Sequence, residues 1–367
     1  MKKKKVWKSP LLEELARSDA ESVRATLCDI TQKRHPACDD PEKMYDVLAS
    51  QLEKLEKPGI AADTKEELEL YARFLNTDAE LSFVNNMELE SDADDLEKFQ
   101  DDFLDLYAEA CEKFIGLAKE CGDKNFVIDV LHDLAVHHTG EEGRSGAFLS
   151  LSEFLSRDEA RRLIDDVLQT LQTHDLDNED YVFKALRDMA DGLSDPEYFE
   201  KVCFLQDPDR SNATCIDVAN AYFLTGDVAN TERLLREVRD PNAKDEEELL
   251  DLSIACLFKQ NKKSEAVKLA EILYGKYPKE FHLARLCQFV SAGRRATLLT
   301  EHEKFRAGDF FNKDFVDLLI AIEEFPRLKE YLGRHAQELA ELPADAKAHF
   351  EKRLADAKQP ELAKRFA

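Results

Sequence analysis

Apolar residues recur at spacings of three and four along almost the whole chain, which is the pattern of helices that bury one face. The sequence has no convincing run in which apolar and polar residues alternate, as they do in strands. Start and stop residues mark the helix boundaries. In Ser156-Arg157-Asp158-Glu159, the serine and the glutamate match a capping box. We therefore predict an all-α fold built from successive helices.

The most regular part of this pattern is residues 211–305. In its middle unit, an apolar helix ends before Asn261, a second helix contains Ala266, and Pro278 closes the unit. This unit resembles a tetratricopeptide repeat, a family in which a small residue begins the second helix and a proline follows twelve positions later. Asn261 stands where the family usually has a turn glycine, and asparagine also tolerates left-handed backbone geometry.

The neighbouring units carry weaker versions of the same landmarks. Gly226 and Gly293 occupy the expected turn positions, and Thr231 stands where the family has alanine. The spacing from 226 to 261 is 35 residues and from 261 to 293 it is 32, close to the family's period of about 34. The resemblance implies helical hairpins that stack into a superhelical α-solenoid with a groove.

A looser resemblance covers roughly residues 90–340. The order of the segments LDLYAEACEKF, HHTGEEGRSGAFLSL, NKKSEAVKLAEIL and NKDFVDLLIAIEEFPRLKEYL is similar to bacterial helical proteins of unknown function. These include the helical region that follows SWIM-type zinc fingers in some proteins. The finger itself is absent, because no cysteine and histidine spacing here matches it. This resemblance implies a helical fold and brings no activity with it.

The helical pattern divides into four predicted parts. The helices before residue 211 share the amphipathic pattern but lack the repeat landmarks, and DAKAHFEKRLADAKQPELAKRFA is a polar helix pair suited to covering the end of a stack. We predict an irregular, acidic helical domain over 1–140, connecting helical hairpins over 141–210, tetratricopeptide-like repeats over 211–305, and a C-terminal helical cap over 306–367.

Acidic residues outnumber basic ones by 77 to 51, which gives a net charge of −26. Residues 39–142 alone hold 29 acidic and 9 basic residues. This excess repels phosphate backbones and anionic membranes, so nucleic acid is an unexpected partner, while basic partners are attracted. The acidic helix faces are interpreted as solvated surface. An alternative is that they mimic nucleic acid and sequester a DNA- or RNA-binding protein.

Targeting and redox signals are weak. The opening MKKKKVWKSP is followed by LLEELARSDAE, which lacks the apolar core of a secretory signal. No apolar stretch approaches the roughly 20 residues of a membrane span. No two of the eight cysteines are separated by just two residues, which removes the strongest zinc and redox signatures. We expect a cytoplasmic protein whose cysteines are reduced and structural.

Residues 136–150, VHHTGEEGRSGAFLS, have the composition of a binding site. His138 and Glu142 are four positions apart, which would suit a metal if a helix continued through the glycine between them. His132 and His137 are five apart, a spacing that turns the two rings away from each other on a helix. A metal-binding or enzymatic site at 132–146 is therefore the less favoured alternative.

The glycines of this loop do not form a phosphate-binding motif. A helix rather than a strand precedes them, their pattern differs from nucleotide-binding loops, and two glutamates would face the phosphates. We interpret the stretch as a long connection that admits Phe148 and Leu151 to the core. No serine-elbow, zincin or catalytic-cysteine motif is present, so we expect neither an enzyme nor a cofactor.

The sequence thus favours a non-enzymatic scaffold or adaptor that binds a protein or peptide, of unknown identity, in the groove of a tetratricopeptide-like array. Polar and aromatic residues of the repeat region are candidates for holding a peptide's carboxylate or acidic side chains. These candidate anchors are Arg233, Arg236, Lys259, Phe281, His282, Arg285 and Gln288.

Overall fold

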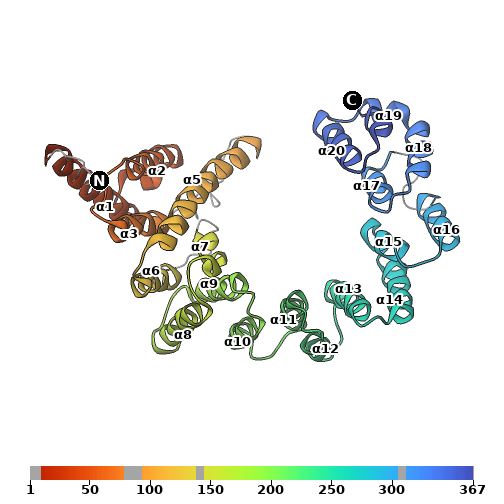
Figure 1. The fold of residues 1–367 in the computed structure, drawn as a ribbon, viewed down its shortest axis with the longest axis horizontal. Helices are drawn as coiled ribbons and strands as arrows, with labels where there is room; N and C mark the ends of the chain where they lie inside the picture. The colour runs from red at the N-terminus through yellow and green to blue at the C-terminus, as the bar shows by residue number, and fades with distance from the viewer. Residues whose placement is uncertain (1–9, 78–92, 138–143, 305–310, 367) are drawn as a thin grey trace, which may run out of the picture. The chain divides into compact units, whose positions relative to one another are not determined.

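The computed structural model describes residues 10–77, 93–137, 144–304 and 311–366. Over those residues the chain forms 20 α-helices and no strand, so the predicted all-α fold is confirmed (Figure 1). The helices form two compact units, Met1–Thr214 and Cys215–Ala367, here called unit 1 and unit 2. The division into four parts at residues 140, 210 and 305 stays a prediction.

Unit 1 begins with long amphipathic helices, most of which start at a capping residue. The hydroxyl of Ser156 accepts a hydrogen bond from the backbone N–H of Glu159, and the carboxylate of Glu159 accepts one from the backbone N–H of Ser156. The predicted capping box is therefore confirmed. The helices of unit 1 are α1 (Pro10–Thr31), α2 (Pro41–Leu55), α3 (Thr64–Leu75), α5 (Ala93–Glu120), α6 (Lys124–Val136), α7 (Ser145–Leu149), α8 (Arg157–Thr173), α9 (Glu179–Gly192) and α10 (Pro196–Gln206).

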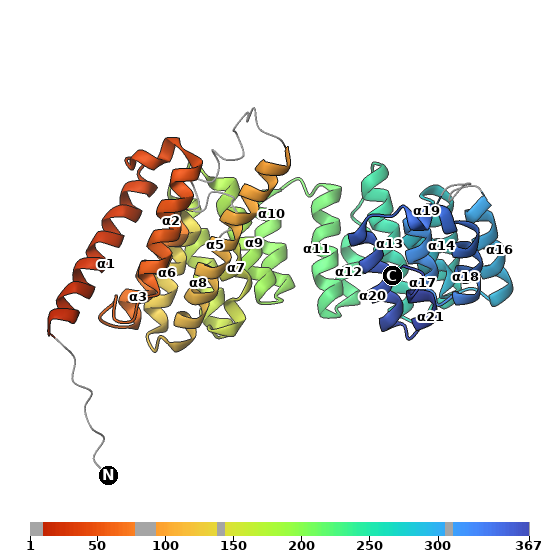
Figure 2. The same ribbon diagram turned by 90° about the horizontal axis from the view of Figure 1, so that it is seen from above.

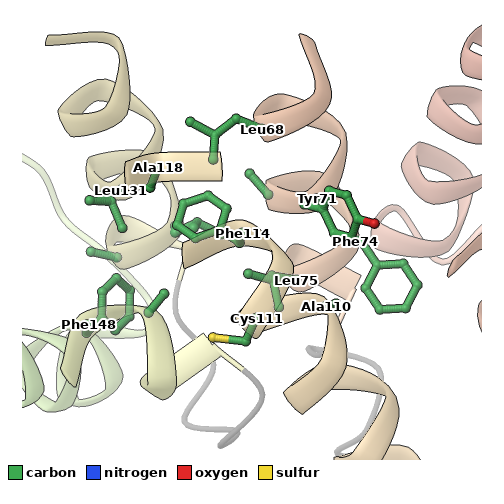
Figure 3. Packing of buried hydrophobic residues seen from close by; sticks show 14 of the residues in the cluster. Leu68, Tyr71, Phe74, Leu75, Ala110, Cys111, Phe114, Ala118, Leu131 and Phe148 are labelled. Atoms are coloured by element: carbon green, nitrogen blue, oxygen red, sulfur yellow. The ribbon is translucent and has the colours of Figure 1, made fainter. Parts of the chain in front are cut away.

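The core of unit 1 is continuous from α1 to α10. Figure 3 shows Phe114 of α5 between side chains of α3 and Leu131 of α6, and both of these labelled residues are fully buried. Phe148 and Leu151 are also fully buried, so the chain after residue 143 does enter the core as predicted. Burial of such large apolar side chains is the main contribution to the stability of the unit.

Unit 2 is a succession of shorter helices that lie side by side (Figure 2). Figure 1 shows α11, α13 and α15 along one side of this row of helices and α12, α14 and α16 along the other. The helices of unit 2 are α11 (Asn212–Thr225), α12 (Val228–Leu235), α13 (Ala243–Lys259), α14 (Lys263–Lys276), α15 (Glu280–Cys287), α16 (Ala292–His302), α17 (Lys313–Ala321), α18 (Phe325–Arg334), α19 (Ala336–Ala340), α20 (Ala344–Asp356) and α21 (Pro360–Ala363).

Several residues that the sequence places at turns or helix crossings of the predicted repeats can be compared with the structure. Asn261 has a φ of 62° in the turn between α13 and α14, and Gly226 has a φ of 89° in the turn before α12. Ala266 of α14 is fully buried, as a small residue at a helix crossing should be. Gly293 differs from the prediction, because it lies inside α16 and not in a turn. Ser291 caps that helix by accepting from the backbone N–H of residue 294, so α16 starts earlier than the glycine suggested.

The cysteines form no disulfide among the described residues, and most of them are buried. All eight cysteines are free thiols. Burial raises the pKa of Cys111 and of Cys287 to about 11, which keeps both in the unreactive thiol form near neutral pH. Among the described residues, no helix combines the length and the apolar character that crossing a bilayer requires.

Candidate functional site

A hollow of about 690 Å³ in unit 2 is lined by α11, α13 and α15, together with Lys279 at the N-terminus of α15. Two large apolar side chains of its lining face solvent. Leu224, near the end of α11, is 71% exposed, and Phe281, in the first turn of α15, is 59% exposed. Large apolar groups left in water beside a hollow mark a surface at which another molecule can be bound.

A buried histidine lies in the same lining. The side chain of His282 is 1% exposed, and its Nε2 lies 2.9 Å from Oε1 of Glu247 on α13. Lys279 Nζ lies 2.6 Å from the same carboxylate oxygen. Burial alone raises the pKa of Glu247, but the hydrogen bonds from Lys279 and His282 outweigh it and hold that pKa below its usual range. The carboxylate is therefore ionised and accepts only, so Nε2 of His282 carries the hydrogen.

The other ring nitrogen of His282 has no hydrogen-bond partner among the described residues, although it is buried. This Nδ1 lies 4.0 Å from Oδ1 of Asp251 on α13, which is beyond hydrogen-bond length. Asp251 accepts a hydrogen bond from Arg285 and stays 38% exposed at the groove. In the neutral tautomer whose hydrogen is on Nε2, Nδ1 is an acceptor, and it lies near a carboxylate oxygen that accepts from Arg285.

A second hollow of about 550 Å³ lies beside the first and shares Lys279 and Phe281 with it. It is lined in addition by residues of α17 and by Arg353 of α20. Together the two hollows, here called the groove, are lined by seven carboxylates and four cationic side chains, which is a formal charge of −3. The groove is therefore acidic as well as partly apolar.

Each cationic side chain of the groove lies within reach of a groove carboxylate. Lys279 pairs with Glu247, and Arg285 pairs with Asp251. Two more pairs complete the set: Lys244 with Glu248 at 3.9 Å, and Arg353 with Asp317. The groove thus has no surplus cation with which to hold an anionic ligand.

Three of the seven candidate anchors from the sequence, Phe281, His282 and Arg285, line the groove. The remaining anchors, Arg233, Arg236, Lys259 and Gln288, do not line it. Sequence reasoning missed Leu224 and Asp251, because nothing in a helical pattern tells an exposed groove residue from an ordinary surface position.

The anchors outside the groove contact their own surroundings. Arg233 and Arg236 form ion pairs with Glu237 and Glu232, four residues away on the same stretch of chain, at 3.4 and 3.2 Å. Lys259 Nζ donates to the backbone oxygen of residue 223 at 2.9 Å. Gln288 is exposed at the end of α15. The two arginine contacts are local, and partly exposed pairs of this kind contribute little to stability, whereas the Lys259 contact joins α13 to α11.

His132 of α6 and His137, which caps the C-terminus of that helix, contact different partners, as their spacing predicted. His132 Nε2 lies 2.9 Å from the hydroxyl of Thr170, whereas His137 Nδ1 lies 2.9 Å from the backbone oxygen of Asp133. The candidate metal ligands His138 and Glu142 lie outside the described residues. Within the described part of the chain, no group of three histidine, cysteine, aspartate or glutamate side chains could hold a metal ion.

Arg144, the next described residue after this segment, is fully buried. Its guanidinium donates to Oδ1 of Asn76 at 2.9 Å and to two backbone oxygens at the end of α6, those of Leu134 at 3.0 Å and His137 at 2.9 Å. Carbonyls at a helix C-terminus lack partners within the helix, so a cation there is favourable. The arginine that gave the loop the composition of a site therefore holds α6 and α7 together.

No family model matches this chain, and no curated protein is similar to it. The tetratricopeptide-like and SWIM-associated resemblances stay predictions. The case for a function therefore rests on the groove itself.

Proposed function

We propose that this protein is a non-enzymatic scaffold or adaptor that binds a segment of a partner protein in the groove of unit 2. The observation that carries the proposal is the pair of exposed apolar side chains, Leu224 and Phe281, in one hollow. The same hollow is lined by the buried His282, whose Nδ1 has no hydrogen-bond partner among the described residues. A bound segment that covers the 59% exposed Phe281 gains roughly 1–2 kcal/mol, because only part of the 1.5–3 kcal/mol of full burial is still available.

The arrangement of helices in unit 2 supports a tetratricopeptide-like interpretation of the groove. Its main hollow is lined by the first helices of successive pairs, α11, α13 and α15, while the second helices lie along the other side of the row. Stacked hairpins of this kind present long concave surfaces that suit an extended or helical peptide. The buried Ala266 and the left-handed Asn261 also support the interpretation.

A displayed library of random peptides, selected on the full-length protein, tests the proposal. The selected peptides are then measured against the double variant Leu224→Ser, Phe281→Ser. The control is Ile272→Ser, since Ile272 is a 50% exposed apolar residue on α14 that lines neither hollow. We expect selected peptides to lose at least about tenfold in affinity for the double variant and to bind the control normally. Selected peptides that bind all three proteins equally would contradict a role for the groove.

A further inference from the structure

We propose that the groove recognises a basic segment, in which an apolar or aromatic side chain packs on Leu224 and Phe281 and flanking lysines or arginines bind the carboxylates. This inference rests on the proposed function and adds the chemical class of the partner. It follows from three features of the groove: its charge balance, the pairing of its own cations, and the buried Nδ1 of His282, which has no hydrogen-bond partner among the described residues.

The charge balance excludes an acidic ligand. The four cationic side chains of the groove each lie within 4.0 Å of a groove carboxylate, so an incoming carboxylate would have to break an existing ion pair. The carboxylates exceed the cations, and the whole chain carries −26. A basic segment therefore approaches along a favourable field and meets Asp314, a carboxylate that no ion pair with another described residue has to release first.

Asp314 is the simplest of these carboxylates. It is exposed at the start of α17, it lines the second hollow, and it forms no ion pair with another described residue. A lysine or arginine of the ligand would be its first cationic partner. Because Asp314 supports no other described side chain, it can be altered with little disturbance of the fold.

His282 and Asp251 give the second, independent indication of a donor. Nδ1 of His282 lies 4.0 Å from Oδ1 of Asp251 and has no partner among the described residues, and in the neutral ring with its hydrogen on Nε2 this nitrogen is an acceptor. A buried polar atom without a partner is unfavourable. Ammonium and guanidinium groups carry several donors and no acceptor, so one such group entering beside the exposed Asp251 can donate to Nδ1 and add a second hydrogen bond to a carboxylate that already accepts from Arg285.

The probes are four fluorescein-labelled peptides of equal length. In the first, lysines stand on both sides of a tryptophan; in the second, glutamates replace the lysines; in the third, glutamines replace them; in the fourth, serine replaces the tryptophan. Fluorescence anisotropy with the full-length protein measures affinity at salt concentrations of about 0.05 M and about 0.3 M. We expect the lysine–tryptophan peptide to bind at least about tenfold more tightly than each of the others, and more weakly at the higher salt.

Three variants locate the binding. Asp314→Asn removes the exposed carboxylate, and His282→Gln keeps a donor to Glu247 but removes the Nδ1 acceptor. We expect each to weaken binding of the lysine–tryptophan peptide several-fold. Glu330→Gln, on α18, removes the same charge from an exposed position outside the groove and should leave the affinity unchanged. Circular dichroism spectra and melting curves establish that each variant is folded.

Some outcomes overturn this inference and leave the proposed function standing. One is that the glutamate or glutamine peptide binds as tightly as the lysine–tryptophan peptide, or more tightly, while the double variant Leu224→Ser, Phe281→Ser abolishes that binding. Another is self-association of the chain that Phe281→Ser abolishes, which would assign the groove to a second copy. Equal loss of affinity in Glu330→Gln would show attraction to the acidic protein as a whole and would also overturn the inference. If no peptide depends on Leu224 or Phe281, the proposed function fails as well.

Discussion

Glu247 of α13 accepts a hydrogen bond from Nε2 of the buried His282 of α15, at 2.9 Å, and so links two helices that line the groove. Glu247→Ala would leave the buried N–H without a partner, and we expect a loss of about 1–3 kcal/mol in the free energy of unfolding. Glu247→Gln keeps an acceptor oxygen and should lose less. Urea denaturation measures both.

The adjacent Glu248 provides a matched control. It faces Lys244 at 3.9 Å, and both side chains are exposed. Glu248→Ala should change the free energy of unfolding by no more than about 0.5 kcal/mol. Equal losses for Glu247→Ala and Glu248→Ala would contradict a structural role for the histidine–glutamate link.

Phe281 should matter little for stability. Its side chain is 59% exposed, so Phe281→Ala should alter the free energy of unfolding by less than about 1 kcal/mol. Phe315 on α17 is the matched comparison, because it is fully buried, and Phe315→Ala should lose about 3–5 kcal/mol. Denaturant melts of the two variants measure the difference. A large loss for Phe281→Ala would mean that this ring belongs to the core and is not kept for a partner.

The features that the sequence predicted well are those determined by neighbouring residues. Helical periodicity, the capping box at Ser156 and the left-handed turn at Asn261 depend on a few consecutive side chains and their backbone. Gly293 was misplaced for the same reason, since a glycine signals a turn only if no better cap lies nearby. Ser291, two positions earlier, is that cap.

The groove was only partly predictable. Phe281, His282 and Arg285 share a short helix, so their proximity follows from the sequence alone. Their partners do not: Glu247 and Asp251 lie more than 30 residues earlier, and it is the packing of α13 against α15 that brings them close. Periodicity shows which face of a helix is apolar but not which polar residues of two helices will meet.

The buried Arg144 should be essential to unit 1. Arg144→Met keeps much of the apolar volume but leaves the oxygens of Asn76, Leu134 and His137 without these donors. We expect a loss of at least about 3 kcal/mol in the free energy of unfolding, since hydrogen bonds from charged groups contribute about 1.5–3 kcal/mol each. Arg144→Lys should recover part of it, because an ammonium can donate but lacks the planar fork. Urea melts measure the free energy of unfolding. A difference between Arg144→Met and the parent of less than about 1 kcal/mol, which is the contribution of one neutral hydrogen bond, would contradict this role.

Gly192 marks the close approach of α9 to α7. A Cβ atom at this position would stand 2.5 Å from the backbone oxygen of Leu149 and 2.6 Å from that of Phe148. Neither oxygen can move without shifting α7, so Gly192→Ala should lower the free energy of unfolding by about 2–3 kcal/mol. Gly116, within α5, has no atom within 4 Å of such a Cβ, and Gly116→Ala should gain about 0.5–1 kcal/mol. Thermal and urea melts measure both signs, and a stabilised Gly192→Ala would refute the close packing.

Asp195 makes the acid stability of unit 1 testable. Its side chain is fully buried, and its Oδ2 accepts from Arg161 at 2.7 Å and from Arg157 at 3.1 Å. Burial raises the pKa of Asp195, but these two hydrogen bonds outweigh it and hold the pKa below its usual range. The folded state therefore binds this proton less readily than the unfolded chain does. The stabilisation is complete above the ordinary carboxyl pKa of about 3.9 and is lost as the pH falls through the lowered value.

Asp195→Asn should therefore have a lower free energy of unfolding than the parent protein at neutral pH. The difference between the two free energies should become smaller as the pH falls below about 4. The measurement is the free energy of unfolding in urea at a series of pH values from neutral to acidic. Arg161→Met supplies a cross-check. In the Asp195→Asn background Arg161 has already lost its buried ionised partner, so Arg161→Met should lower the free energy of unfolding by less than it does in the parent protein. Parallel stability curves for the parent and Asp195→Asn over the whole range would rule out a contribution from this carboxylate, because a group with a lowered pKa must make the two curves converge in acid.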